Sequence, residues 1–164
     1  MARLRPAQQA ELDARNCDQH RFQQPNGCGA AGGGWLTSVL NAAIPEDYLG
    51  GSFVNFHNAC NNHDGCYGTA GYNRYQCDAK FGTDLTSECM KGRDTWRNDA
   101  IDFGYSGAQV TNYVTEQLYQ CTSQGTIMQS AVGQFGAPAF EAGQAVGACL
   151  KLKAEALNLG CAIN

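Results

Sequence analysis

The chain has 164 residues, which suits one domain with a substantial hydrophobic core. Its formal net charge of −4 and its pI near 5.2 argue against a nucleic-acid-binding protein, which usually carries a basic face. The same charge argues against strong, purely electrostatic attraction to an anionic membrane, and no window approaches the roughly 18 apolar residues of a membrane span.

Nine cysteines favour an oxidising compartment, where each disulfide adds about 2–4 kcal/mol of stability. The count is odd, so at least one thiol stays free or pairs elsewhere. We therefore expect a secreted or extracellular protein. Residues 1–21 lack the apolar core of a signal peptide. Either a leader has been removed and replaced by a start Met, or the domain was cut from a larger protein.

Residues 1–25 are polar and predict a short N-terminal helix or an arm. Residues 26–34 hold five glycines, too many for a regular element, and predict a loop. An apolar patch follows, which either lines the mouth of a site or packs in the core. Its members are Trp35, Leu36, Val39, Leu40 and Ile44.

Ser52 is a candidate N-cap for a helix that runs to about Tyr67. One face of it collects residues at three- and four-residue steps, namely Phe53, Phe56, Cys60, His63 and Tyr67. A second helix is predicted from Tyr75 to about Met90 or beyond. Its inner stripe is Cys77, Phe81, Leu85 and Glu88/Cys89. Because the link is short, the two helices should be antiparallel neighbours.

A third helix is predicted over residues 108–121, and a weaker helical pattern runs from Phe140 to Leu159. Between them Gly133, Gly136 and Pro138 interrupt the pattern. The last, Gly/Ala-rich helix either fills the core or forms a partner surface. No strand-rich region is evident. We therefore expect one mainly α domain over residues 1–164, with C-terminal helices over 106–164.

The segment from Cys60 to Tyr67 reads CNNHDGCY, and Cys77-Asp78 follows on the next helix. If Cys66 bridges Cys77, His63 and Asp78 come within hydrogen-bond reach. Histidine takes a proton near neutral pH, and a buried carboxylate fixes its tautomer and stabilises the imidazolium. Asp64 lies about 100° further round the helix and suits a hard cation such as calcium.

This set of residues, together with Asn26-Gly27-Cys28-Gly29, resembles the secreted, calcium-dependent phospholipases A2 and is most similar to the group XII type. That family has a C-C-x-x-H-D-x-C-Y helix, a Gly-rich calcium loop before it and a C-D pair on the next helix. The resemblance covers about residues 26–90. It implies two antiparallel, disulfide-linked core helices that carry the active site.

The resemblance also implies a role for each matching residue. His63 would be the general base that activates a water molecule against the ester carbonyl, with no acyl-enzyme. Asp78 would orient His63, and Tyr67 would hydrogen-bond Asp78. The cofactor would be Ca²⁺, held by the carboxylate of Asp64 and by backbone oxygens of Gly27, Gly29 and Ala31. The Gly29 N–H and the ion would stabilise the developing oxyanion.

The implied disulfides are Cys28–Cys60 and Cys66–Cys77. The first cysteine of the family doublet is Ala59 here, and its usual partner is Asp84, so both ends of one disulfide are missing together. Proximity in the sequence suggests Cys149–Cys161. The partners of Cys17, Cys89 and Cys121 cannot be deduced.

Simpler readings of the same residues stay open. His63 alone would be a core histidine, Asp64 a surface carboxylate and Asp78 a helix cap or a partner of Arg74. A zinc site is a further alternative, because cysteine and histidine are zinc ligands. Its ligands would be Cys60, His63, Cys66 and Cys77. Cys60 and Cys66 lie about 120° apart round a helix, which makes convergence on one ion awkward.

The expected activity is hydrolysis of the sn-2 acyl ester of glycerophospholipids at a membrane or micelle surface. The products are a lysophospholipid and a free fatty acid. A rival from another class is a catalytically silent phospholipase-like module that binds lipid or a receptor. A second alternative concerns context, a toxin domain of a larger exported bacterial protein. The sequence names no protein partner.

Overall fold

The computed structural model describes residues 2–3, 6–15, 17, 28, 54–158 and 161–162. In these ranges the chain is mainly α, as expected. The helices are α1 (Pro6–Ala14), α3 (His57–Tyr67), α4 (Arg74–Lys91), α5 (Arg93–Asp102), α6 (Gly107–Phe135) and α7 (Ala137–Asn158). Two short strands, β1 (Ala2–Arg3) and β2 (Cys161–Ala162), pair in parallel, with Ala2 opposite Cys161.

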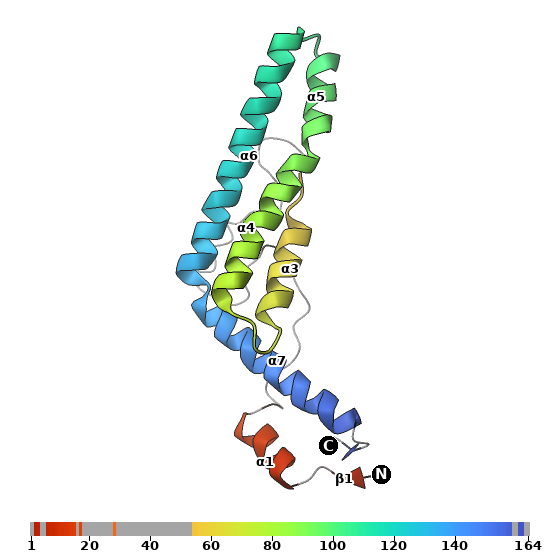
Figure 1. Cartoon of the computed structure of the whole chain (residues 1–164), viewed down its shortest axis with the longest axis vertical. Coiled ribbons are helices and arrows are strands. Elements are labelled where there is room, and N and C mark those ends of the chain that lie inside the picture. Colours follow the sequence, from red (N-terminus) through yellow and green to blue (C-terminus); the bar gives the residue numbers. More distant parts are fainter. Residues whose placement is uncertain are drawn as a thin grey trace.

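The helices form an elongated arrangement (Figure 1). Helix α6 packs against both α4 and α5, and α3 packs against α4 and α7. At Gly136 the chain turns from α6 into α7, which passes the α3–α4 turn and reaches α1. Strand β1 and both chain ends lie at the α1 end of the molecule. The α3–α4 pair is therefore enclosed by two helices that come much later in the sequence.

The first core helix begins later than the sequence predicted. Helix α3 starts at His57, whose backbone N–H donates to the side-chain oxygen of Asn55 at 2.7 Å. An asparagine that bonds the chain two residues on initiates a helix well. The expected N-cap, Ser52, lies outside the described residues. Helix α4 matches its prediction within a residue at each end, because Asn73 caps it by accepting from the Tyr75 N–H at 2.8 Å.

The predicted end of the third helix at residue 121 is wrong. Helix α6 continues to Phe135 through two glycines that resemble breakers in the sequence. A side chain added at Gly125 would come within 3.3 Å of Leu85, so this glycine permits close packing of α6 on α4. Helix α7 starts at Ala137, with Pro138 in its first turn, where no backbone donor is needed.

The core lies between α3, α4, α5 and α6. Its most buried members are Phe56, Phe81, Leu85, Cys89, Trp96, Cys121 and Met128. The predicted inner faces are confirmed where they are described: Phe56, Cys60, His63 and Tyr67 of the first, and Cys77, Phe81, Leu85 and Cys89 of the second, are all buried. Phe53 lies outside the described residues. Helical periodicity alone therefore identified which face of each helix points inward.

Four disulfides link the described residues: Cys17–Cys149, Cys28–Cys60, Cys66–Cys77 and Cys89–Cys121. Two of them are the pairs that the family resemblance implied. The expected Cys149–Cys161 bond is wrong, because Cys149 pairs with Cys17 across 132 residues. Both cysteines are buried with Leu12 where α1 meets α7. Such a density of disulfides is compatible with a secreted or extracellular protein.

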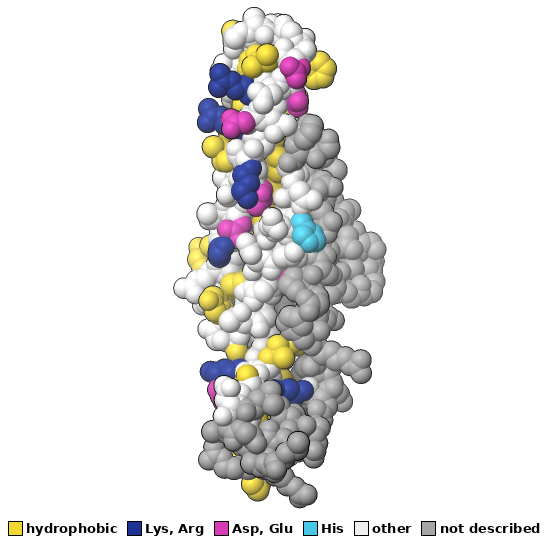
Figure 2. Space-filling model, turned by 90° about the vertical axis from the view of Figure 1, so that its right-hand side faces the viewer, with side chains coloured by type: hydrophobic (Ala, Val, Ile, Leu, Met, Phe, Trp, Pro, Cys, Tyr) yellow, Lys and Arg dark blue, Asp and Glu magenta, His cyan; other side chains and the backbone are white. Residues whose placement is uncertain are grey.

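Charged side chains of both signs mix along the described part of the face in Figure 2. Lys80 pairs with Asp84, and Lys91 with Glu88, each within one helical turn. Exposed pairs of this kind contribute little to stability. Within the described ranges, no helix combines the length and the apolar character needed to cross a bilayer.

Candidate active site

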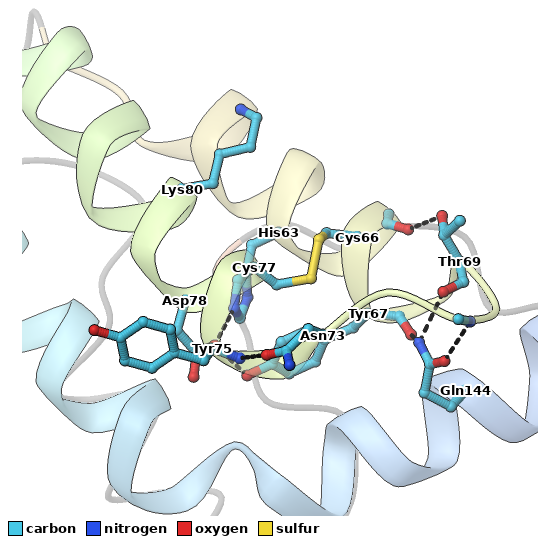
Figure 3. Close-up of a disulfide and its surroundings, with 12 residues drawn as sticks. His63, Cys66, Tyr67, Thr69, Asn73, Tyr75, Cys77, Asp78, Lys80 and Gln144 are labelled. Carbon is cyan, nitrogen blue, oxygen red and sulfur yellow. Dashed lines mark hydrogen bonds and ion pairs between the residues drawn. A yellow bond between two sulfur atoms is a disulfide. The ribbon is translucent and has the colours of Figure 1, made fainter.

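Two side chains of α3 contact one carboxylate of α4 (Figure 3). The Nε2 atom of His63 lies 2.9 Å from Oδ1 of Asp78, and the hydroxyl of Tyr67 donates to the same oxygen at 2.5 Å. His63 and Tyr67 are one turn apart on α3, and Asp78 faces them from α4. The structure thus brings together the histidine, the orienting carboxylate and the tyrosine that the sequence singled out.

The site is buried among rings. Only 7% of His63 and 8% of Asp78 is exposed. The imidazole centroid lies 4.1 Å from the Tyr67 ring and 4.6 Å from the Phe81 ring. Burial lowers the pKa of His63 below its ordinary value of 6.5, although the hydrogen bond and the charge of Asp78 oppose that shift. The imidazole is therefore neutral near pH 7.

The hydrogen bonds assign the tautomer of this neutral ring. An ionised carboxylate only accepts hydrogen bonds, so Nε2 of His63 carries the proton that it shares with Asp78. The other nitrogen, Nδ1, then holds the free lone pair and is the proton acceptor. Burial and the contact with Asp78 raise the pKa of Tyr67, which keeps its hydroxyl protonated and donating. The arrangement is that of a general base held by a carboxylate.

A disulfide and a set of polar contacts hold the two helices in register. Cys66 and Cys77 are bonded with their Cα atoms 5.7 Å apart. Further along, Asn62 donates to Asp84 at 3.3 Å. Because the contacts run in opposite order along α3 and α4, the helices are antiparallel. At the two positions where the family that the sequence resembles has a further disulfide, this chain has a buried Ala59 and an Asp84 that pairs with Lys80.

Of the residues expected to bind calcium, the structure describes only Asp64. Asp64 is half-buried on α3 beside His63. Cys28 is bonded to Cys60 with a Cα–Cα distance of 5.0 Å, and Cys60 precedes Asp64 by about one turn. Gly27, Gly29 and Ala31 lie outside the described residues, as does the apolar patch of residues 35–44. Among the described side chains, no cluster of three or more His, Cys, Asp or Glu could hold a metal ion.

Two of the simpler readings do not fit the described contacts. The zinc alternative needs thiolates, but Cys60, Cys66 and Cys77 are all consumed in disulfides. Asp78 does not pair with Arg74, because its carboxylate holds His63 and Tyr67. The guanidinium of Arg74 reaches the carbonyl of Gly133 at 3.4 Å.

The C-terminal helices supply contacts that sequence reasoning missed. Gln129 of α6 donates to the backbone carbonyl of Asp78 at 3.2 Å, and Phe140 of α7 packs edge-on against Tyr67. Gln144 of α7 donates to the backbone carbonyl of Tyr67 at 2.9 Å. Single glutamines leave no recognisable pattern. The one sequence feature that could have indicated these contacts is the four-residue spacing of Gly143 and Gly147. Glycines at that spacing lie on one face of a helix and are typical of close packing against a neighbour.

No model of a known protein family matches this chain, and no match was found among curated proteins or solved structures. The functional assignment therefore rests on the residues of the site and their geometry.

Proposed function

We propose that the protein is a calcium-dependent phospholipase A2 that hydrolyses the sn-2 acyl ester of glycerophospholipids at a membrane or micelle surface. The observation that carries the proposal is the shared hydrogen bonding of His63 and Tyr67 to the buried carboxylate of Asp78. The family resemblance around these residues supplies the substrate class. The four disulfides support action outside the cell.

In this mechanism His63 acts on water directly. Its Nδ1 accepts one proton of a water molecule while the water oxygen attacks the ester carbonyl carbon. Asp78 stabilises the imidazolium that forms, and Tyr67 holds Asp78 in place. When the tetrahedral intermediate collapses, the carbon–oxygen bond to the glycerol breaks. His63 returns the proton to that oxygen, which leaves a lysophospholipid and a free fatty acid.

Among the described residues, the carboxylate of Asp64 has the chemistry of a calcium ligand. A carboxylate and backbone carbonyls are the oxygen ligands that calcium prefers. Asp64 would supply the carboxylate, and Gly27, Gly29 and Ala31 the carbonyls. The Cys28–Cys60 disulfide supports this, because it joins the residue between Gly27 and Gly29 to the helix of Asp64. If bound there, calcium would supply the positive charge that polarises the ester carbonyl and stabilises the oxyanion.

The decisive experiment measures fatty-acid release from mixed phospholipid vesicles with calcium and with a calcium chelator. Wild-type protein should release fatty acid only with calcium. His63→Gln should retain its circular dichroism spectrum and lose about 10²–10⁴-fold in rate, because it lacks the general base. Wild-type release by His63→Gln would refute the mechanism. Absent turnover by a wild-type protein that still binds the vesicles would favour the silent lipid-binding module.

A further inference from the structure

Gln144 of α7 makes three hydrogen bonds to the end of α3 and the turn that follows it (Figure 3). Its side-chain Nε2 donates to the carbonyl of Tyr67 at 2.9 Å and to that of Thr69 at 2.8 Å. Its Oε1 accepts from the backbone N–H of Gly71 at 2.9 Å. One side chain therefore uses both donors and its acceptor on a single turn of the chain.

The contact to Tyr67 completes the end of the helix. The last four carbonyls of a helix have no partner within it and must find one elsewhere. Here Gly68 and Thr69 satisfy those of Asp64, Gly65 and Cys66. The carbonyl of Tyr67 receives the amide of Gln144, which comes from 77 residues away. Thus α7, and not the local chain, holds the last residue of α3.

The backbone of α7 approaches this end of α3 very closely. A side chain added at Gly143 would come within 2.7 Å of the Tyr67 carbonyl oxygen, and one at Gly147 within 2.9 Å of the Ala70 nitrogen. One turn before Gln144, the Phe140 ring lies 5.2 Å from the Tyr67 ring in an edge-on arrangement. Helix α7 therefore contacts both the backbone carbonyl and the ring of Tyr67.

We propose that Gln144 is a positioning residue for the hydrolytic site, which acts through Tyr67 on Asp78 and His63. The expected effect on catalysis rests on the proposed function, whereas the effect on the positions of Tyr67, Asp78 and His63 does not. Tyr67 is the link, because its hydroxyl bonds Asp78 and its ring packs on His63. If the hydrogen bond from Gln144 to the backbone carbonyl of Tyr67 is lost, Tyr67 can shift. The hydroxyl of Tyr67 then no longer holds Asp78 in one place. His63 then loses the fixed partner that orients it.

The first test compares Gln144→Met, which keeps length and helix propensity, with the matched control Gln134→Ala, an exposed glutamine of α6. Gln144→Met should lower kcat about tenfold to 100-fold with KM unchanged, as misplaced catalytic groups do. Gln144→Glu, which keeps only the acceptor for Gly71, should behave in the same way. A wild-type kcat in either variant would overturn the proposal.

A double-mutant cycle tests whether Tyr67 is the link. In a Tyr67→Phe background the hydroxyl contact to Asp78 is already gone, so Gln144→Met should lower kcat by less than about threefold. Equal losses in the two backgrounds would show that Gln144 acts by another route and would overturn the proposal.

A third measurement does not depend on activity. The Nε2–H proton of His63 is buried and hydrogen-bonded, so it should give a downfield proton NMR signal that is absent from His63→Gln. In Gln144→Met this proton should exchange with water at least about tenfold faster than in wild type and Gln134→Ala. An unchanged rate would overturn the positioning role. If wild-type protein releases no fatty acid, the proposed function fails, and this comparison still decides the role of Gln144.

Discussion

His63 is subject to two opposing effects at the residue scale. The charge and hydrogen bond of Asp78 favour the protonated ring, whereas burial among aromatic rings favours the neutral one. Burial is the larger effect, so the pKa of His63 falls below 6.5. A general base must be neutral before it accepts a proton, and the lowered pKa of His63 keeps the imidazole neutral at neutral pH.

The pH profile follows from that direction. Fatty-acid release at saturating calcium should be constant near pH 7 and fall on the acid side, with an inflection below pH 6.5. An inflection above pH 6.5 would contradict the burial argument.

Stability should depend on pH through the same group. The unfolded chain binds the His63 proton at about pH 6.5, and the folded chain only at lower pH. The stability that this depressed pKa contributes is therefore present above pH 6.5 and is lost as the pH falls through the folded pKa. Measured in a chelator, wild-type protein should lose more unfolding free energy between pH 7 and pH 5 than His63→Gln does. Equal losses would contradict the depressed pKa.

Asp64 offers a third prediction at the residue scale. Asp64→Asn removes the charged calcium ligand and should lower release about 10²–10³-fold, with loss of the response to calcium. The matched control is Asp84→Asn, which removes a carboxylate from α4 that pairs with the exposed Lys80. That control should keep wild-type release, and the same loss in both variants would argue against a specific role for Asp64.

At the scale of elements, glycines decide how closely the helices approach. Gly125 lets α6 pack against Leu85, and Gly143 and Gly147 let α7 approach the end of α3. These glycines have helical neighbours on both sides and do not end their helices. Close packing at these positions offsets the low helix propensity of glycine.

Two glycine substitutions should therefore have opposite effects. Gly147→Ala places a methyl group against the Gly68 carbonyl and the Ala70 nitrogen, and should destabilise the protein by about 1–3 kcal/mol. Gly133→Ala in α6 meets open space and should stabilise it by about 0.5–1 kcal/mol through helix propensity. Chemical denaturation measures both, and equal signs would contradict the close approach.

At the scale of the molecule, the four disulfides among the described residues fall into two groups. Three of them have at least one cysteine in α3 or α4: Cys28–Cys60, Cys66–Cys77 and Cys89–Cys121. The fourth, Cys17–Cys149, joins the chain just after α1 to α7 and is buried with Leu12. Loss of a disulfide from the first group should therefore affect both stability and the geometry of the site, whereas loss of Cys17–Cys149 should affect stability alone.

The paired substitution of Cys17 and Cys149 by serine should lower the unfolding free energy by about 2–4 kcal/mol and leave fatty-acid release intact well below the unfolding midpoint. The matched pair Cys66 and Cys77 should lose stability and activity together, because that bond adjoins Asp78. Calorimetry and the release assay measure both. A loss of activity in the first pair would contradict the separation of the two groups.

Helical periodicity in the sequence determined the mainly α class and the inner faces of α3 and α4. The contact of His63 with Asp78 was expected if Cys66 bridges Cys77, and the contact of Tyr67 with Asp78 was implied by the family resemblance. These features depend on contacts within a short stretch, whose register follows from the helix repeat. The sequence did not determine the end of α6, the partner of Cys149 or the contacts of Gln144. Each depends on residues more than 30 positions apart, which only tertiary packing brings together. A glycine or glutamine gives no local sign of which distant backbone it will face.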